Sequence, residues 1–237
     1  MTLFNIKLAV LVMLLLACEK QDETIFVPQV IETQEFGELS YLALGDSYTI
    51  GESVANQDSF PKQLEKRLEV ELNTTIQTRI LAQTGWRTDN LLDAIATENL
   101  ENSYDFVTLL IGVNNQYQGL SFVKYEEEFP ELLKIAIQLA GNNPGRVVVV
   151  SIPDWGFTPF GNDRDQQKIS SEIDNYNAYA KAESEVSEVR FVEITDITRE
   201  GLDKPQLVAS DGLHPSGEAY KLFTNRIAPI IADVLKD

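Results

Sequence analysis

Short apolar runs alternate with segments of helical spacing from residue 39 to the end of the chain. Five of these runs have the length of a buried strand, at residues 39–44, 76–82, 105–111, 146–152 and 189–194. The fourth run contains four successive valines, Val147 to Val150. Such a continuous β-branched run is typical of a central strand in a parallel sheet, where both faces are covered.

Between these runs, apolar residues recur at intervals of three and four, which predicts amphipathic helices. Their apolar positions are Leu64, Leu68 and Leu72; Leu91, Leu92 and Ile95; Phe129 to Ala140; Ile169 to Ala180; and Leu222 to Ile231. Thr88 is a suitable N-cap for the second helix, and Gly141 a stop for the third. We expect Pro130 to split the third helix from a shorter turn before it, and Pro229 to kink the last helix.

Strands that alternate with helices are joined by right-handed crossovers, which give a parallel sheet with helices on both faces. About 200 residues with five such units fit a single domain. The pattern therefore predicts an α/β domain over residues 39–237.

The first 17 residues have the features of a secretory signal. Lys7 precedes ten apolar residues, Leu8 to Ala17, a run too short for the roughly 20 residues of a membrane span. The stretch Leu15-Leu16-Ala17-Cys18 resembles a bacterial lipobox, which implies cleavage before Cys18 and attachment of lipid to it. The alternative is a plain signal with an incidental cysteine. It is disfavoured because Cys18, the only cysteine, stands at the position that the lipobox requires.

Residues 18–38 are polar and acidic, without a sustained period, and we expect a tether between lipid and domain. The expected location is exported and lipid-anchored to the bacterial envelope, facing either the periplasm or the surface. The membrane partner is then the lipid on Cys18.

The chain carries 37 Asp and Glu against 19 Lys and Arg, a formal charge of −18. This charge disfavours nucleic acid as a partner, because its binding needs cations that neutralise phosphates. His214 is the only histidine, so a multi-histidine metal site is excluded, and we expect neither a metal nor a cofactor. Any chemistry that needs an imidazole must use His214.

Residues capable of acyl-transfer chemistry follow the ends of the predicted strands. Ser47 follows the first strand, Gly85 the second and Asn114 the third, and Asp211 and His214 share the loop before the last helix. In an open α/β sheet, these loops meet at one edge. Each residue alone is an ordinary turn residue, but the combination points to a common site.

A serine hydroxyl becomes a nucleophile when a base removes its proton, and His214 can be that base. Asp211, three residues earlier, can fix the tautomer of the imidazole and stabilise its cation. The amides of Ser47 and Gly85 and the side-chain NH₂ of Asn114 are suitable donors for an oxyanion hole.

These segments together resemble the SGNH, or GDSL-type, serine hydrolases. Gly45-Asp46-Ser47-Tyr48 is similar to the first block of that family, Gly85 to the second, Gly112-Val113-Asn114-Asn115 to the third and Asp211-Gly212-Leu213-His214 to the fifth. The resemblance covers residues 39–237. It implies Ser47 as nucleophile, His214 as base, Asp211 as its orienting acid, and Ser47, Gly85 and Asn114 as the oxyanion hole. It also implies a flavodoxin-like three-layer α/β/α sandwich whose five strands have the order 2-1-3-4-5.

Two residues depart from the family pattern. Tyr48 stands where leucine is common, and Asn115 where aspartate is usual, which puts the local loop geometry in question. The α/β-hydrolase signature Gly-x-Ser-x-Gly is absent, which disfavours that fold.

The substrate is less well defined by the sequence. Aromatic residues follow strands two, three and four and could stack on a sugar, line an acyl groove or pack the loops; they are Trp86, Tyr117, Trp155, Phe157 and Phe160. The sequence favours an esterase for short-acyl esters such as acetylated carbohydrates. The alternatives are a lysophospholipase or thioesterase for longer acyl chains, and a non-catalytic glycan-binding surface lipoprotein.

Overall fold

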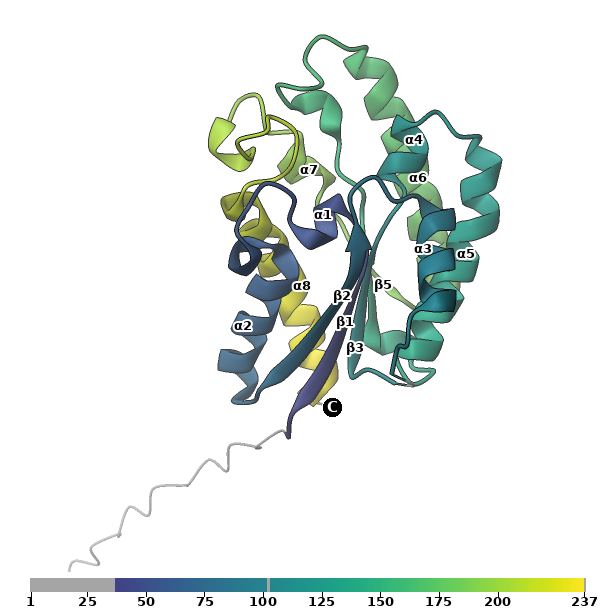
Figure 1. The fold of residues 1–237 in the computed structure, drawn as a ribbon, viewed down its shortest axis with the longest axis vertical. Coiled ribbons are helices and arrows are strands. Elements are labelled where there is room, and N and C mark those ends of the chain that lie inside the picture. The colour runs from purple at the N-terminus through teal and green to yellow at the C-terminus, as the bar shows by residue number, and fades with distance from the viewer. Residues whose placement is uncertain (1–36, 102, 237) are drawn as a thin grey trace, which may run out of the picture. The chain divides into compact units, whose positions relative to one another are not determined.

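A parallel sheet lies between two layers of helices in the computed structural model, which describes residues 37–101 and 103–236 (Figure 1). Within these residues, the five strands have the order β2-β1-β3-β4-β5, which confirms the predicted fold class and strand order. Their bounds are β1 (Leu39–Asp46), β2 (Ile76–Gln83), β3 (Phe106–Leu110), β4 (Val147–Val150) and β5 (Arg190–Val192). All four strand pairs are parallel, so the carboxyl ends of the strands share one edge.

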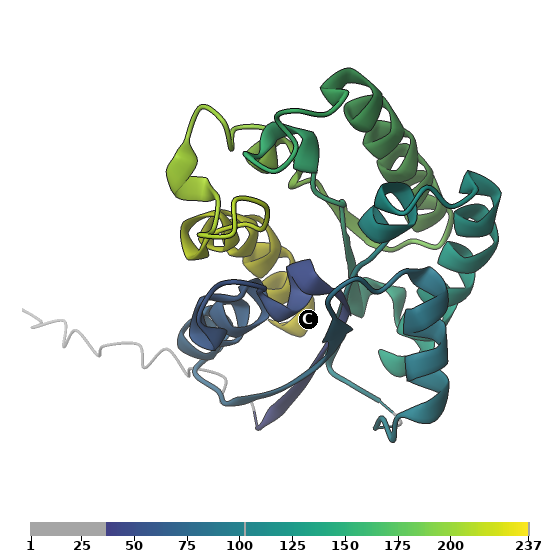
Figure 2. The same ribbon diagram turned by 45° about the horizontal axis from the view of Figure 1, so that its top comes forward.

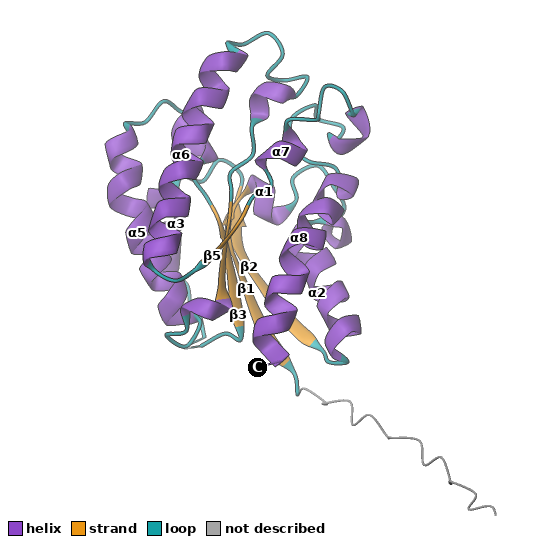
Figure 3. Ribbon diagram, turned by 180° about the vertical axis from the view of Figure 1, so that it is seen from behind, coloured by secondary structure: helices purple, strands orange, loops and turns teal. Residues whose placement is uncertain are grey.

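Helices cover both faces of the sheet. The α-helices are α1 (Ser47–Ile50), α2 (Phe60–Leu72), α3 (Thr88–Thr97), α4 (Val113–Tyr117), α5 (Phe122–Leu139), α6 (Gln166–Val186), α7 (Thr195–Thr198) and α8 (Gly217–Lys236). Short 3₁₀ helices are η1 (Asn56–Asp58), η2 (Pro144–Arg146), η3 (Trp155–Phe157) and η4 (Pro205–Leu207). Helices α2 and α8 lie together on one face, and α3, α5 and α6 lie on the other (Figures 1 and 3).

The predicted signal peptide, Cys18 and the tether as far as residue 36 lie outside the described residues. In the part that the structure does describe, no helix combines the length and the apolarity needed to cross a membrane.

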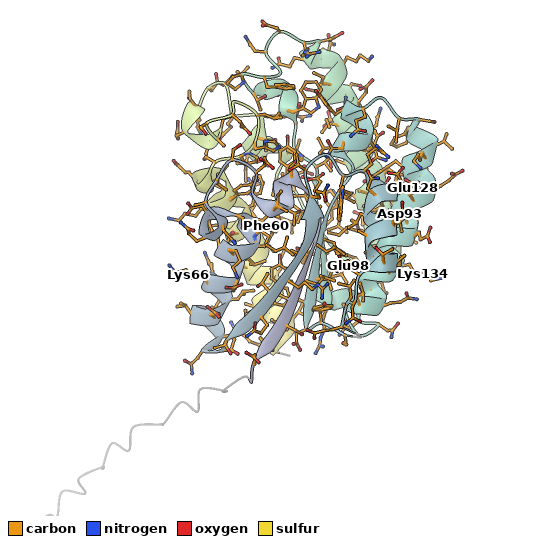
Figure 4. All side chains as sticks on the ribbon, in the orientation of Figure 1. Phe60, Lys66, Asp93, Glu98, Glu128 and Lys134 are labelled. Carbon is orange, nitrogen blue, oxygen red and sulfur yellow. The ribbon has the colours of Figure 1, made fainter. Side chains whose placement is uncertain are left out.

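The interior strand β1 is buried on both sides, as its continuous apolar run predicts. Tyr41, Leu42, Ala43 and Leu44 are all fully buried. Burial of a large apolar side chain stabilises the fold by about 1.5–3 kcal/mol, so this strand is a rigid base for whatever follows it. In Figure 4, Phe60 lies on the inner side of α2 and Lys66 on its outer side, in keeping with the amphipathic pattern of that helix.

The expected break at Pro130 was wrong, because α5 is continuous from Phe122 to Leu139. Proline has no N–H, so the carbonyl of Glu126, four residues earlier, loses its helical donor. The Tyr179 hydroxyl of α6 donates to that carbonyl at 2.9 Å. A neighbouring helix therefore supplies the missing donor. The local sequence around Pro130 does not show this contact. Pro229 likewise lies inside α8.

The expected N-cap of α3 was wrong by one residue. The helix begins at Thr88 and its N-cap is Arg87, whose N–H donates to the Asn90 side chain at 3.2 Å. The Thr88 hydroxyl has other partners, because it donates to Glu128 at 2.5 Å and accepts from the Asn115 side chain at 2.6 Å. Asn115 also accepts from the Thr88 N–H at 3.1 Å, so a buried amide holds the start of this helix.

Candidate active site

Ser47 is the first residue of α1, directly after the last residue of β1. Asp46 caps that helix, because its Oδ1 accepts from the Tyr48 N–H at 3.0 Å. The serine is 3% exposed, at the carboxyl edge of the sheet that Figure 2 brings forward. The sequence Asp-Ser thus ends a strand, caps a helix and presents a hydroxyl at that edge.

Gly45 is required by close packing at the turn from strand to helix. A Cβ at this position would lie 2.1 Å from the Thr49 Oγ1 of α1 and 2.5 Å from the Leu110 carbonyl of β3. The backbone carbonyl cannot move aside without disturbing the sheet. A larger residue here would displace α1 and therefore the serine at its start.

His214 and Asp211 form a direct pair in the loop before α8. The His214 Nδ1 lies 2.6 Å from Asp211 Oδ2, and Asp211 Oδ1 accepts from the N–H groups of Leu213 and His214 at 2.9 and 3.0 Å. The histidine is 7% exposed. Partial burial would by itself raise the pKa of Asp211, but the bonds from the imidazole, these two amides and Ser53 lower it to about 2. The carboxylate is therefore ionised and orients the imidazole.

The two expected oxyanion donors outside α1 lie on the neighbouring loops. Gly85 has φ of +80°, which favours glycine, and a Cβ there would meet no atom within 4 Å. The Asn114 side chain donates through Nδ2 to the Trp86 carbonyl at 3.0 Å and to Asp46 Oδ2 at 3.5 Å. These contacts fix the Asn114 amide beside Asp46, the residue before Ser47.

A cavity of about 350 Å³ brings the predicted residues together. It is lined by Ser47, Tyr48, Thr84, Gly85, Val113, Asn114, Tyr117, Gln118, Trp155, Phe160, Leu213 and His214. Asp211 lies behind the imidazole and does not line the cavity. Within residues 37–101 and 103–236, no hydrogen bond joins the Ser47 hydroxyl to His214.

Three of the five expected aromatic residues line this cavity, namely Tyr117, Trp155 and Phe160. The Tyr117 ring stands edge-on to Trp155, with centroids 5.3 Å apart, and Phe160 lies 6.1 Å from both. The Trp155 indole N–H donates to the Gln116 side chain at 2.8 Å, which fixes its ring. Tyr117 is 49% exposed and Phe160 38%, so both present free surface at the cavity mouth. Trp86 does not line the cavity.

Gln118 and Asp46 are site residues that the sequence did not single out. Gln118 donates to the Gly85 carbonyl at 3.0 Å and accepts from Arg87 at 2.9 Å, so it holds the loop of the second block. Asp46 is fully buried between Ser47 and Asn114. Burial raises the pKa of Asp46 to about 7, against the lowering effect of the Tyr48 N–H and the Asn114 amide. A single sequence gives no sign that Asp46 is so enclosed.

Metal binding has no candidate in the described part of the chain, where no three or more His, Cys, Asp or Glu side chains gather in a suitable group.

The chain matches the model of the GDSL-like lipase/acylhydrolase family over residues 43–222. It therefore belongs to this family of carboxylic ester hydrolases, as the SGNH resemblance of its blocks predicted. A comparison with curated proteins gives no match.

Solved structures of similar fold agree with this assignment. TesA superposes with a TM-score of 0.64 at 14% identity, over 82% of this chain and 99% of its own. The lipase/acylhydrolase from Enterococcus faecalis gives 0.60 at 20% identity, over 82% and 96%. The acetylxylan esterase Axe2 from Geobacillus stearothermophilus gives 0.57 at 17% identity, over 83% and 96%. At these identities the likeness concerns the fold.

Proposed function

We propose that Ser47, His214 and Asp211 form a catalytic triad that hydrolyses carboxylic esters through an acyl-enzyme. The observation that carries this proposal is the 2.6 Å bond between Asp211 and His214, at the wall of the cavity that also contains Ser47. A carboxylate on Nδ1 leaves Nε2 of the imidazole as the proton acceptor.

In the first half-reaction, the Ser47 Oγ attacks the ester carbonyl carbon while its proton passes to His214 Nε2. The tetrahedral intermediate then expels the alcohol, which takes that proton from the imidazolium. In the second half-reaction, a water molecule gives its proton to His214 and its oxygen attacks the acyl carbon. The acid leaves, and the imidazolium returns the proton to Ser47.

The negative oxygen of each intermediate needs donors already in place. The backbone amides of Ser47 and Gly85 and the Nδ2 of Asn114 are the proposed donors. Each contributes about 2.7–4 kcal/mol in enzymes where such a donor has been removed. The Trp86 carbonyl takes one proton of the Asn114 Nδ2 at 3.0 Å and so holds the amide in position. The other proton makes only a long contact of 3.5 Å with Asp46 Oδ2, and it is the one proposed to turn to the oxyanion.

Short-acyl esters, such as those of acetylated carbohydrates, are the proposed substrates. The cavity of about 350 Å³ is small, and the exposed rings of Tyr117 and Phe160 at its mouth suit the apolar face of a sugar. Axe2, an acetylxylan esterase, has a similar fold, which supports the same substrate class here.

We further propose that the protein is exported and anchored through lipid on Cys18. The described domain starts at Gly37 and enters β1 at Leu39, the opposite end of that strand from Ser47 (Figure 1). An anchored tether would therefore join the domain at the end away from the candidate site. Replacement of Cys18 by serine should move the protein from the membrane fraction to the soluble fraction, and unchanged fractionation would contradict the anchor.

The catalytic proposal is tested with p-nitrophenyl esters of acetate, butyrate and octanoate and with a fluorophosphonate probe. We expect hydrolysis with a preference for acetate, and covalent labelling that Ser47→Ala abolishes. His214→Ala should lose at least 10³-fold in kcat, because no other imidazole can replace it. A matched control is Ser171→Ala, which changes an exposed serine on α6 that does not line the cavity.

Two results would decide against this function. A preference for octanoate would favour the lysophospholipase or thioesterase alternative for longer acyl chains. Absence of both hydrolysis and labelling at Ser47 would favour the glycan-binding alternative. A screen of acetylated oligosaccharides against lysophospholipids then identifies the natural class.

A further inference from the structure

The turn that follows α1 is tied to the backbone of the nucleophile. The N–H groups of Gly51 and Glu52 both donate to the Ser47 carbonyl, at 3.2 and 3.0 Å. The Glu52 carboxylate accepts from the hydroxyl of Thr84, the residue before Gly85. This turn therefore moves with the nucleophile and with the loop of the second block.

Ser53, at the end of this turn, reaches the acid of the proposed triad. Its Oγ donates to Asp211 Oδ2 at 2.8 Å, across 158 residues of sequence. The same oxygen bonds to His214 Nδ1 at 2.6 Å. Among the described residues, the other groups bonded to Asp211 are the backbone amides of Leu213 and His214 and the His214 ring, which all belong to its own loop. Within the described residues, Ser53 is thus the only donor to Asp211 that lies outside the loop of Asp211 and His214.

The backbone of Ser53 is held in an uncommon conformation. Its φ is +63°, in the left-handed region that non-glycine residues rarely adopt. Glycine would adopt this backbone more readily, but it has no hydroxyl. Residues kept in such conformations often belong to functional sites, where surrounding contacts determine them.

We propose that Ser53 is a positioning residue that sets the place of the Asp211–His214 pair relative to Ser47. The proposal rests on the triad proposed above. Without Ser53, the carboxylate is held only by its own loop, and the whole loop is free to shift against α1. The Ser53 hydroxyl binds Asp211, and the N–H groups of the two residues before it, Gly51 and Glu52, donate to the Ser47 carbonyl. This turn therefore links Asp211 to Ser47. The imidazole is then kept where it can reach the serine.

The test compares Ser53→Gly with Ser53→Ala in the full protein. Both variants lack the hydroxyl, so we expect kcat for p-nitrophenyl acetate to fall about fivefold in each, the rate equivalent of one ordinary hydrogen bond. KM should stay within about twofold, since the lost contact orients a catalytic group and not the substrate. Thermal stability should differ between the two variants, because only glycine relieves the backbone. We expect kcat to depend on whether the hydroxyl is present, and thermal stability to depend on how well the residue accepts the positive φ angle.

Asn73→Gly is the matched control. Asn73 has φ of +50° at the end of α2, and it lies at the opposite edge of the sheet from the cavity. Replacement there should change stability without changing kcat. In addition, Ser53→Gly should cause no further loss in an Asp211→Ala background, because the pair that it positions is already broken.

Wild-type kcat in both Ser53 variants would overturn the proposal, as would a full additional loss in the Asp211→Ala background. Neither result bears on the triad itself, which fails only if His214→Ala or Ser47→Ala stays active. A rise in KM with unchanged kcat would also overturn the proposal, since it would place Ser53 in substrate binding.

Discussion

The ring of Tyr48 packs against the imidazole of His214, with centroids 4.9 Å apart and planes inclined by 53°. Tyr48 is the residue after the proposed nucleophile and is 4% exposed. The imidazole is therefore bonded through Nδ1 to Asp211 and packed beside a tilted aromatic ring. This contact gives a physical role to the residue that departs from the family pattern in the first block.

Replacing Tyr48 by leucine should remove the aromatic ring that packs beside the imidazole of His214. An aromatic pair contributes about 0.5–1.5 kcal/mol beyond the area that it buries, so we expect kcat to fall about two- to tenfold. The smaller side chain should also lower the free energy of unfolding by about 1–2 kcal/mol. Steady-state kinetics and urea unfolding measure the two effects separately.

Tyr48→Phe is the control for this prediction, because it keeps the ring. Its kcat should remain within about twofold of wild type, since no hydrogen bond of the hydroxyl is involved in the packing of the two rings. An equal loss in the phenylalanine and leucine variants would show that the hydroxyl matters more than the ring.

Asp211→Asn should lower kcat by about 10⁴-fold while leaving KM nearly unchanged, by analogy with the same change in another triad. The amide cannot stabilise the imidazolium, and it can favour the wrong tautomer of His214. Fluorophosphonate labelling should slow by a comparable factor. A variant that retains a tenth or more of the wild-type kcat would contradict the assignment of Asp211.

The strand and helix pattern was sufficient to predict a parallel sheet between helices, since β1, β3 and β4 are short and mostly buried runs. The strand order came from the resemblance to the SGNH hydrolases, and the structure confirms it. The errors came from contacts between distant segments. The helix α5 passes through Pro130 because Tyr179 donates to the carbonyl that proline leaves free. The start of α3 is fixed by Asn115, which follows another strand.

The gathering of the candidate residues at one edge of the sheet was predictable where a residue has a chemistry of its own, as with His214, Asp211 and Asn114. The role of a residue was not predictable where it depends on contacts with distant parts of the chain. Ser53 is an ordinary turn serine until its φ angle and its bond to Asp211 are known. Asp46 is only part of a short motif in the sequence, and its full burial, which raises its pKa, is seen only in the structure.

Asn115→Asp would install the usual family residue and should destabilise this chain. The amide of Asn115 donates to the Thr88 hydroxyl, whose proton goes to Glu128. A carboxylate at position 115 has no proton to donate, and it would compete with Glu128 for the one proton of Thr88. We expect a loss of about 1–3 kcal/mol in the free energy of unfolding at pH 7, measured by urea unfolding.

Glu128→Gln combined with Asn115→Asp should restore most of that stability, because it removes the competing charge. The free energy of unfolding of the single variant Asn115→Asp should also recover as the pH falls and the new carboxylate takes up a proton. A single variant as stable as wild type at pH 7 would show that the loop accepts either residue.

Asp46 should make the stability of the protein fall as the pH rises from about 4 to 7. Burial raises its pKa in the folded state to about 7, whereas the unfolded chain has a value near 3.9. Between these values the folded state binds more protons than the unfolded state, so the contribution is fully present below pH 4 and is lost as the pH rises through 7. The slope is at most about 1.4 kcal/mol per pH unit.

Asp46→Asn removes the group that titrates. Its thermal midpoint should therefore be compared with that of wild type at each pH. The amide oxygen can still accept from the Tyr48 N–H, but the amide nitrogen cannot accept from Asn114. We expect the difference in thermal midpoint between variant and wild type to move in favour of the variant from pH 4 to pH 7. Asp233→Asn, an exposed change on α8, is the control for the loss of one acidic group. Parallel curves for Asp46→Asn and wild type would mean that the buried carboxyl keeps an ordinary pKa.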